Sequence, residues 1–294
     1  MTPRLARARS GQGIREIEVA VVRDAVAYLL VEANYNIPTD VLDALRAAVA
    51  QEQSPLARRT LEQIVRNYEV AAIDRVPVCQ DSGVTVVLLD VGQDVHFTGG
   101  LLNEAVYAGI REGTRAGYLR QSVTGDPTRL LKMAGDEAPG VIHIELVPGD
   151  RVELTVASKG FGGENMSALR MLVPADGAAG IRDVVVDTVD RAGANACPPV
   201  IVGVGVGGTF EAAALLAKRA ALRPITIRHA RADIRELEAD LLNRVNALGI
   251  GAQGLGGVVT ALAVNIETLP THIAGLPVAV NLNCHSTRRA SMTL

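Results

Sequence analysis

The chain of 294 residues contains no tryptophan, and its aromatic side chains are five tyrosines and three phenylalanines. Aliphatic residues must therefore build most of the core, and the hydrophobic fraction of 48% is large enough for a sizeable one. The formal net charge is only −3, which gives no reason to expect a nucleic acid or a membrane surface as partner. No apolar run approaches the roughly 18 residues that a membrane-spanning helix needs.

Lysine and cysteine are also scarce. Arginine carries most of the positive charge, because the only lysines are Lys132, Lys159 and Lys218. The three cysteines are Cys79, Cys197 and Cys284, and no C-x-x-C pair is present. A small, odd number of cysteines without a secretion signal indicates a reducing compartment, so a cytoplasmic protein is expected.

Hydrophobic periodicity predicts a single mixed α/β domain over residues 1–294, mainly helical at 1–75 and with an α/β core at 76–288. A short disordered start is expected, because four arginines there are followed by no apolar targeting segment. Predicted helices cover residues 17–33, 101–119, 181–192, 209–222 and 233–248, and another begins at Ser54-Pro55. Predicted strands cover residues 84–91, 141–147, 151–157, 200–206, 258–266 and 277–282.

Each cysteine lies beside the end of a predicted strand. Cys79 and Cys197 each precede one, and Cys284 follows the last. A free cysteine is most often a small buried hydrophobe. Strand ends in α/β proteins are nevertheless where functional sites gather, and the three positions together favour one shared site.

Three thiolates limit the choice of cofactor. Structural zinc takes four ligands at short spacings, and His285 is a poor fourth ligand because neighbours in a strand point apart. An iron–sulfur cubane held by three cysteines leaves one iron without a protein ligand, and that iron can act as a Lewis acid. Three distant cysteines with no fourth fit the cubane best.

Glycine-rich stretches at 159–165, 203–209 and 249–257 allow either close backbone approach to a ligand or tight turns and packing. Gly203, Gly205 and Gly208 match the weak dinucleotide pattern G-x-G-x-x-G. An NAD site needs an acid about 20 residues further on to bind the ribose, and no acid stands at the next expected strand end. NADP binding, which does not need that acid, therefore stays only as a remote alternative. His272, twelve residues before Cys284, is either structural or part of a site.

Five segments resemble, in order and spelling, the class I fumarase family, specifically the α subunit of its two-subunit forms. They are PVCQDSG (77–83), LRQS (119–122), KGFGGEN (159–165), CPPVIVGVGVGGT (197–209) and PTHIAGLPVAVNLNCH (270–285). The α subunit of L(+)-tartrate dehydratase is the closest sibling. The resemblance implies the fold of the cluster-binding domain of class I fumarases. It also implies a hydro-lyase for fumarate and malate, or alternatively for L(+)-tartrate or a related hydroxy-diacid.

The resemblance further implies a 4Fe-4S cluster on Cys79, Cys197 and Cys284. By the same matching, the substrate contacts are Gln80, Asp81, Arg120 and Gly162, and the catalytic residues are Asp81 and His272. A separate β subunit would complete the site and supply the base, in an α2β2 assembly. The stretch 131–140 departs from the family pattern and leaves the diacid open. The resemblance ends at Arg288, and the residues that follow are expected to be too few to fold.

Overall fold

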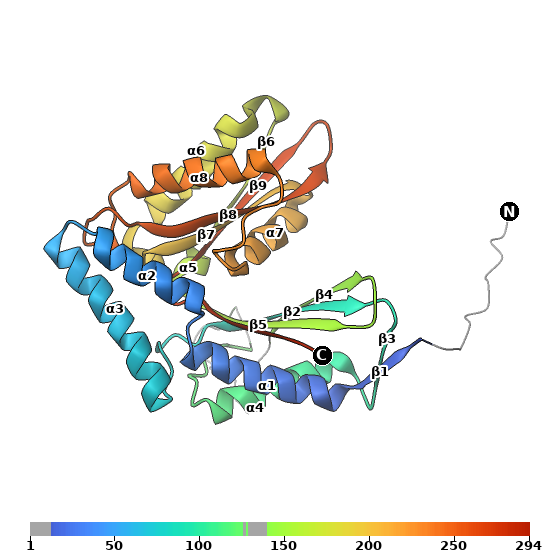
Figure 1. Ribbon diagram of the computed structural model, residues 1–294. Coiled ribbons are helices and arrows are strands. Elements are labelled where there is room, and N and C mark those ends of the chain that lie inside the picture. The colour runs from blue at the N-terminus through green and yellow to red at the C-terminus, as the bar shows by residue number, and fades with distance from the viewer. Residues whose placement is uncertain (1–12, 126–127, 129–139) are drawn as a thin grey trace.

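The computed structural model describes residues 13–125, 128 and 140–294 (Figure 1). Two sequence predictions concern residues that lie mostly outside these described ranges. The predicted disordered start, up to residue 12, and the departing stretch at 131–139 lie outside the described residues.

Two four-stranded mixed sheets form the frame of the protein (Figure 1). The β2 sheet has the order β10-β5-β2-β4 and contains β2 (Val84–Gly92), β4 (Val141–Val147), β5 (Val152–Lys159) and β10 (Arg288–Thr293). The β7 sheet has the order β6-β9-β7-β8 and contains β6 (Ala168–Leu172), β7 (Val200–Gly208), β8 (Ala261–Thr271) and β9 (Leu276–Asn283). A separate ribbon pairs β1 (Arg15–Glu18) with β3 (Val95–Thr98). The predicted α/β class is confirmed.

Helices separate and cover the sheets. They are α1 (Val19–Tyr35), α2 (Thr39–Gln51), α3 (Pro55–Asp74), α4 (Leu102–Ala116), α5 (Phe161–Asn165), α6 (Gly177–Ala192), α7 (Phe210–Leu222) and α8 (Ala232–Asn246). The first core cluster joins α1 and α4 to one face of the β2 sheet, and another joins α6 and α8 to one face of the β7 sheet. Between the sheets lies α7, which packs on β7 and contacts Val86 and Leu88 through Leu222. Within the described ranges, no helix is both long and apolar enough to cross a bilayer.

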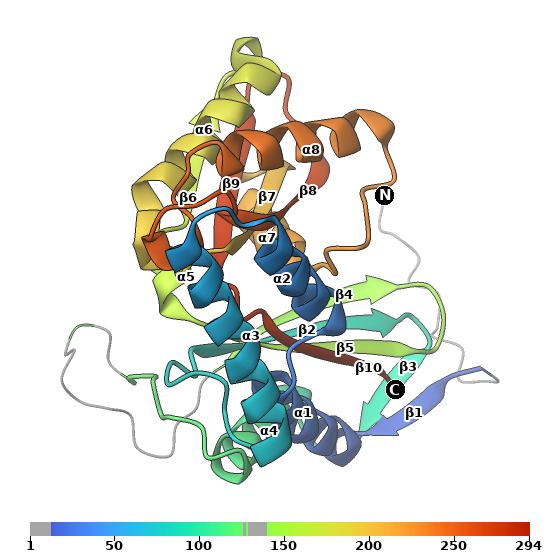
Figure 2. The ribbon, with the colours of Figure 1, turned by 60° about the vertical axis from the view of Figure 1, so that its left-hand side comes forward.

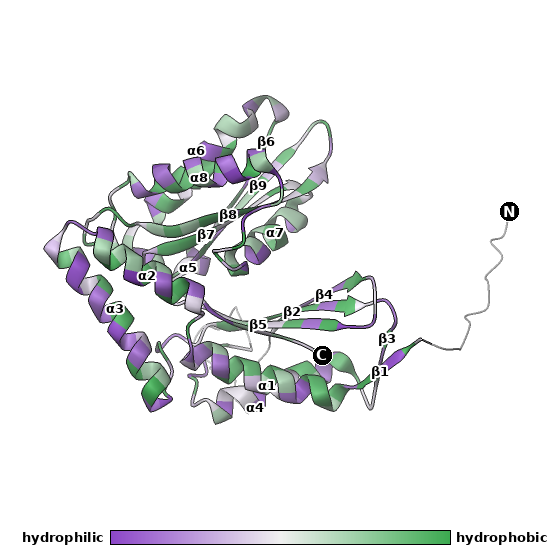
Figure 3. Cartoon of the chain, in the orientation of Figure 1, coloured by the Kyte–Doolittle hydropathy of each residue, from purple (hydrophilic) through white to green (hydrophobic). Residues whose placement is uncertain are grey.

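Local sequence signals explain why several elements begin where they do. The hydroxyl of Ser54 accepts the N–H of Ala57 at 3.4 Å, and Pro55 occupies the first turn of α3, as predicted. The central strands β2 and β7 are largely hydrophobic (Figure 3), because helices pack against their sheets. The helix predicted from Ile17 starts two residues later, because Ile17 pairs with Phe97 in the small ribbon.

The end of the chain corrects one expectation. The residues after Arg288 were predicted to be too few to fold, and this is wrong. They form β10, which pairs antiparallel with β5, with Arg288 opposite Ser158. A six-residue segment is ordered here because the exposed edge of the β2 sheet offers it hydrogen-bond partners. Residues 284–287 carry the chain from the end of β9 in the β7 sheet to β10 in the β2 sheet (Figure 2), so the two sheets are directly connected.

Candidate active site

The three cysteines lie where strand ends of both sheets meet. In the β7 sheet, the start of β7 pairs with the end of β9, with Ile201 opposite Asn283, so Cys197 and Cys284 share one edge. In the β2 sheet, the start of β2, which follows Cys79, lies beside the end of β5 and the start of β10. Only residues 284–287 separate β9 from β10. The fold therefore brings the three cysteine segments to one end of the molecule, as the sequence predicted.

The thiols are close enough to influence one another. All three are free and half-buried. Burial raises the pKa of Cys197, and charge on Cys284 and Cys79 would raise it further. The N–H of His285 donates to the carbonyl of Cys197 at 3.4 Å, which links two of the cysteine segments.

The three thiols are the candidate ligands of a metal group. Within the part of the chain that the structure describes, no three Cys, His, Asp or Glu side chains are placed to hold one metal ion. Sulfur ligands of one zinc ion would lie only about 4 Å apart, given zinc–sulfur bonds of about 2.3 Å. The three thiols are the residues here that could hold an iron–sulfur group, whose irons would spread the ligands apart.

The Cys79 loop carries two of the predicted substrate residues. Gln80 is exposed, and its amide oxygen accepts a hydrogen bond from the Cys79 thiol at 3.3 Å. The carboxylate of Asp81 accepts the N–H of Gly83 and that of Phe161, both at 2.9 Å. Asp81 therefore fastens the Cys79 loop to the start of α5, and both of its oxygens are engaged by backbone.

Arg120 and Gly162 also lie beside the cysteine segments. The N–H of Arg120 donates to the hydroxyl of Ser82 at 2.8 Å, while its exposed side chain makes no hydrogen bond or ion pair with any described residue. A Cβ on Gly162 would lie 2.9 Å from the carbonyl oxygen of Asn195 and 3.9 Å from the Cys197 sulfur. The first turn of α5 therefore packs closely on the Cys197 segment only because this residue is glycine.

The structure does not bring His272 to the cysteines. His272 precedes β9, whereas Cys284 follows it. Eight extended residues span about 26 Å, so the two lie at opposite ends of the β7 sheet. The exposed imidazole accepts the N–H of Ala274 at 3.1 Å and borders a separate pocket with Pro174 and Ile181. Proximity along the sequence was misleading because an extended strand separates its ends.

One buried and two partly buried charged groups that the sequence did not single out as site residues lie beside the cysteine segments. Lys159 is only 2% exposed, donates to the carbonyl of Leu282 at 2.7 Å and forms an ion pair of 3.1 Å with Glu164. Glu164 also accepts from Lys218 at 2.5 Å and from Asn281 at 2.9 Å. This Lys159–Glu164–Lys218 network holds α5 against the end of β9, directly before Cys284. The rarity of lysine was the one sequence signal for it.

Tyr68 and His285 form a second unassigned contact. The Tyr68 hydroxyl and Nδ1 of His285 are hydrogen-bonded. Burial, together with the charge of Arg288, lowers the pKa of His285 to about 4, so the imidazole is neutral at physiological pH. Because Tyr68 belongs to α3, its hydrogen bond to His285 ties the Cys284 segment to that helix.

The glycines of β7 have a packing role. A Cβ on Gly203 would lie 2.2 Å from the carbonyl oxygen of Ala217, and one on Gly205 would lie 2.0 Å from that of Ala213. Both residues lie inside the strand, whereas a dinucleotide fingerprint needs its glycines in the turn that follows a strand. The remote NADP alternative is therefore wrong, because these glycines let α7 approach β7.

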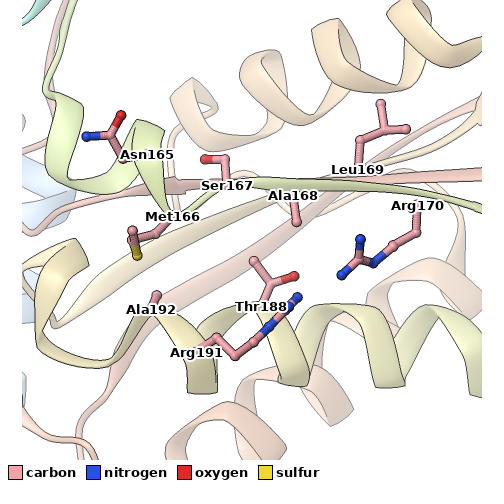
Figure 4. A pocket seen from close by; sticks show the side chains of 9 residues that line it. All are labelled: Asn165, Met166, Ser167, Ala168, Leu169, Arg170, Thr188, Arg191 and Ala192. Carbon is pink, nitrogen blue, oxygen red and sulfur yellow. The ribbon is translucent and has the colours of Figure 1, made fainter.

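A further pocket lies between β6 and α6 (Figure 4). The side chains of Arg170 and Arg191 both line it, and Arg191 pairs with Asp187 at 2.7 Å. No predicted site residue lines this pocket, so it is separate from the cysteine site.

The chain is similar along most of its length to proteins of one enzyme family. The family model described as "Fumarate hydratase (Fumerase)" matches residues 23–293. A Methanocaldococcus jannaschii protein provisionally named as an L(+)-tartrate dehydratase α subunit is 41% identical over 274 residues, covering 92% of this chain and 96% of its own length. The L(+)-tartrate dehydratase α subunit of Escherichia coli K12 is 31% identical over 271 residues, covering 92% of this chain and 89% of that protein.

Proposed function

The chain belongs to the fumarate hydratase family of hydro-lyases, and on this basis we propose that it is the α subunit of an enzyme that adds or removes water at a small hydroxy-diacid. The observation that carries the proposal is the convergence of Cys79, Cys197 and Cys284 at one end of both sheets. Gln80, Asp81, Arg120 and Gly162 lie in the same place.

The three cysteines would hold a 4Fe-4S cluster. When bound, such a cluster supplies a Lewis acid for a hydroxyl and a carboxylate of the substrate. The half-buried thiols are not paired as disulfides, which suits a reducing cytoplasm. The tight contact of Gly162 with the Cys197 segment would narrow the site and keep water out.

The remaining predicted residues would bind the substrate or order the site around it. The exposed guanidinium of Arg120, which pairs with no described residue, would bind a substrate carboxylate through two parallel hydrogen bonds. The exposed amide of Gln80 can contact a substrate oxygen. Asp81, with both carboxylate oxygens engaged, would act by ordering this side of the site. His272 is excluded from the proposed set, because it lies at the far end of β9. The proton-abstracting base is assigned to the partner.

A separate β subunit would complete the active site. Apolar side chains are exposed on segments next to the cysteine segments, namely Val76 at 44%, Phe161 at 46%, Leu255 at 47% and Val258 at 41%. Such a rim suits burial beneath another protein. The named relatives are themselves α subunits. We propose two copies of each chain in the assembly.

Two hydro-lyase reactions are candidates. The family description favours fumarate and malate, and the names of the relatives favour L(+)-tartrate. The chain should be reconstituted anaerobically with iron and sulfide and assayed on malate, fumarate and both tartrates, with and without the neighbouring gene product. We expect turnover of one of these diacids, and only with the partner present. Full turnover by the isolated chain would refute the two-subunit proposal, and inactivity of the complete, iron-loaded assembly on all four would refute the substrate class.

Arg120 offers a sharper test of substrate binding. Arg120→Lys keeps the charge but loses the planar fork, so kcat/KM should fall by roughly tenfold or more, as part of a charged hydrogen bond worth about 1.5–3 kcal/mol is lost. The iron content should stay unchanged. Arg115→Lys, on the exposed last turn of α4, is the matched control and should keep wild-type kinetics. Wild-type kinetics in Arg120→Lys would show that the Arg120 side chain does not bind a substrate carboxylate.

A further inference from the structure

Arg288 is a buried cation without a matching acid. Its side chain is 2% exposed and among the largest fully buried ones in the chain. Among the described residues, no Asp or Glu forms an ion pair with it, and its buried Nε has no hydrogen-bond partner. A buried guanidinium is strongly unfavourable unless an anion compensates it.

The neighbouring buried cations are paired. Arg289, the next residue, contacts the two carboxylate oxygens of Asp40 at 2.8 and 3.1 Å. Lys159 and Lys218 both contact Glu164. Arg288 is therefore the one buried cation around the cysteine segments that forms no ion pair with a described carboxylate.

The guanidinium of Arg288 lies between two cysteine segments. Nη1 donates to the carbonyl oxygen of Asp81, two residues after Cys79, and to Oδ1 of Asn34 at 3.4 Å. Along the chain, Arg288 follows Cys284 by four residues. Burial raises the pKa of Tyr68, and that phenol also experiences the charges of Arg288 and of all three cysteines. One buried region thus contains the unbalanced cation and the three thiols.

We propose that Arg288 is the positioning residue that balances the charge of the cluster. This inference rests on the proposed function, because it takes the missing anion to be the group that the three cysteines hold. A 4Fe-4S cluster with three thiolates carries net negative charge. The cluster and the Arg288 guanidinium would therefore each offset the cost of burying the other. The contact with the Asp81 carbonyl would in addition fix the Cys79 loop relative to Cys284.

The test compares iron-loaded and iron-free protein for each variant. Arg288→Gln and Arg288→Met remove the charge, Arg288→Lys keeps it, and Arg289→Gln is the matched control with a balanced charge. The readouts are anaerobic iron loss to a chelator, the midpoint potential of the cluster, and the Tm gain on loading. We expect Arg288→Gln to lose iron about tenfold faster, to shift the potential to more negative values and to gain less Tm on loading.

Arg288→Lys should keep a cluster potential near that of the wild type. Arg289→Gln should match the wild type in iron loss, potential and Tm gain. If Arg288→Gln does not fold, Arg288→Met serves instead, and its iron-free form should be at least as stable as the wild type. Wild-type potential and Tm gain in both uncharged variants would overturn the inference, as would an Arg288→Lys that behaves like them. A wild-type chain that binds no iron would overturn the proposed function itself.

Discussion

Replacing Cys79, Cys197 or Cys284 by serine is expected to abolish cluster binding and to reduce hydratase turnover by about 1,000-fold or more. Thiolates are the protein ligands of iron–sulfur clusters, and a serine hydroxyl at the same position is a much poorer ligand. Loss of a Lewis acid worth several kcal/mol corresponds to a rate loss of about this size. The effect should be similar for all three, because their segments converge on one site.

Iron and sulfide per chain, with visible absorption, measure this loss after anaerobic reconstitution. Far-ultraviolet circular dichroism confirms that each variant folds. Ser291→Ala, at an exposed position of β10 where the hydroxyl is hydrogen-bonded to that of Thr155, is a control that should bind iron normally. Full cluster occupancy in one cysteine variant would remove that residue from the ligand set. One zinc ion per wild-type chain in place of iron would contradict the cluster altogether.

Glu164→Gln is expected to destabilise the iron-free chain by about 3 kcal/mol. The substitution leaves the buried ammonium of Lys159 without its anion, and breaking a buried pair in this way costs about 3–5 kcal/mol. The lower end applies because the Glu164 side chain is 31% exposed. Urea unfolding measures the loss, and Glu236→Gln on the exposed face of α8 should change stability by no more than about 0.5 kcal/mol. A loss below about 0.5 kcal/mol in Glu164→Gln would mean that the Lys159–Glu164 pair contributes no more than an exposed ion pair.

The same residue predicts a pH dependence. Burial alone would raise the pKa of Glu164, but Lys159, Lys218 and Asn281 outweigh it and lower the pKa to about 2. A depressed carboxylate pKa stabilises the fold above the unfolded-state value, and the contribution disappears as pH falls towards the folded-state value. The stability difference between wild type and Glu164→Gln should therefore shrink between about pH 4.5 and pH 2. A difference that stays constant over this range would contradict the ion-pair assignment.

Local signals predicted most of the elements. Ser54 and Pro55 mark the start of α3, and the continuous β-branched run from Val84 predicts a strand buried on both faces. Such signals act over a few residues and need no partner. Short segments such as β1, β6 and β10 carry no comparable signal, because each is ordered only by a neighbouring strand that is distant in the sequence. The strands β4 and β5 were predicted, but not that β2 lies between them.

The amino-acid sequence by itself determined which residues could hold a cofactor and which family the motifs resemble, because thiols and motif spelling are chemical properties of the chain. Only the tertiary structure decided which of these residues meet. It brought Cys79, from one sheet, to Cys197 and Cys284, from the other, and it placed His272 a whole strand away. It also decided that Arg289 pairs with Asp40, whereas Arg288 forms no ion pair with an acid in the part of the chain that the structure describes. Charge balance in a protein interior depends on distance and burial, and neither is written in the order of residues.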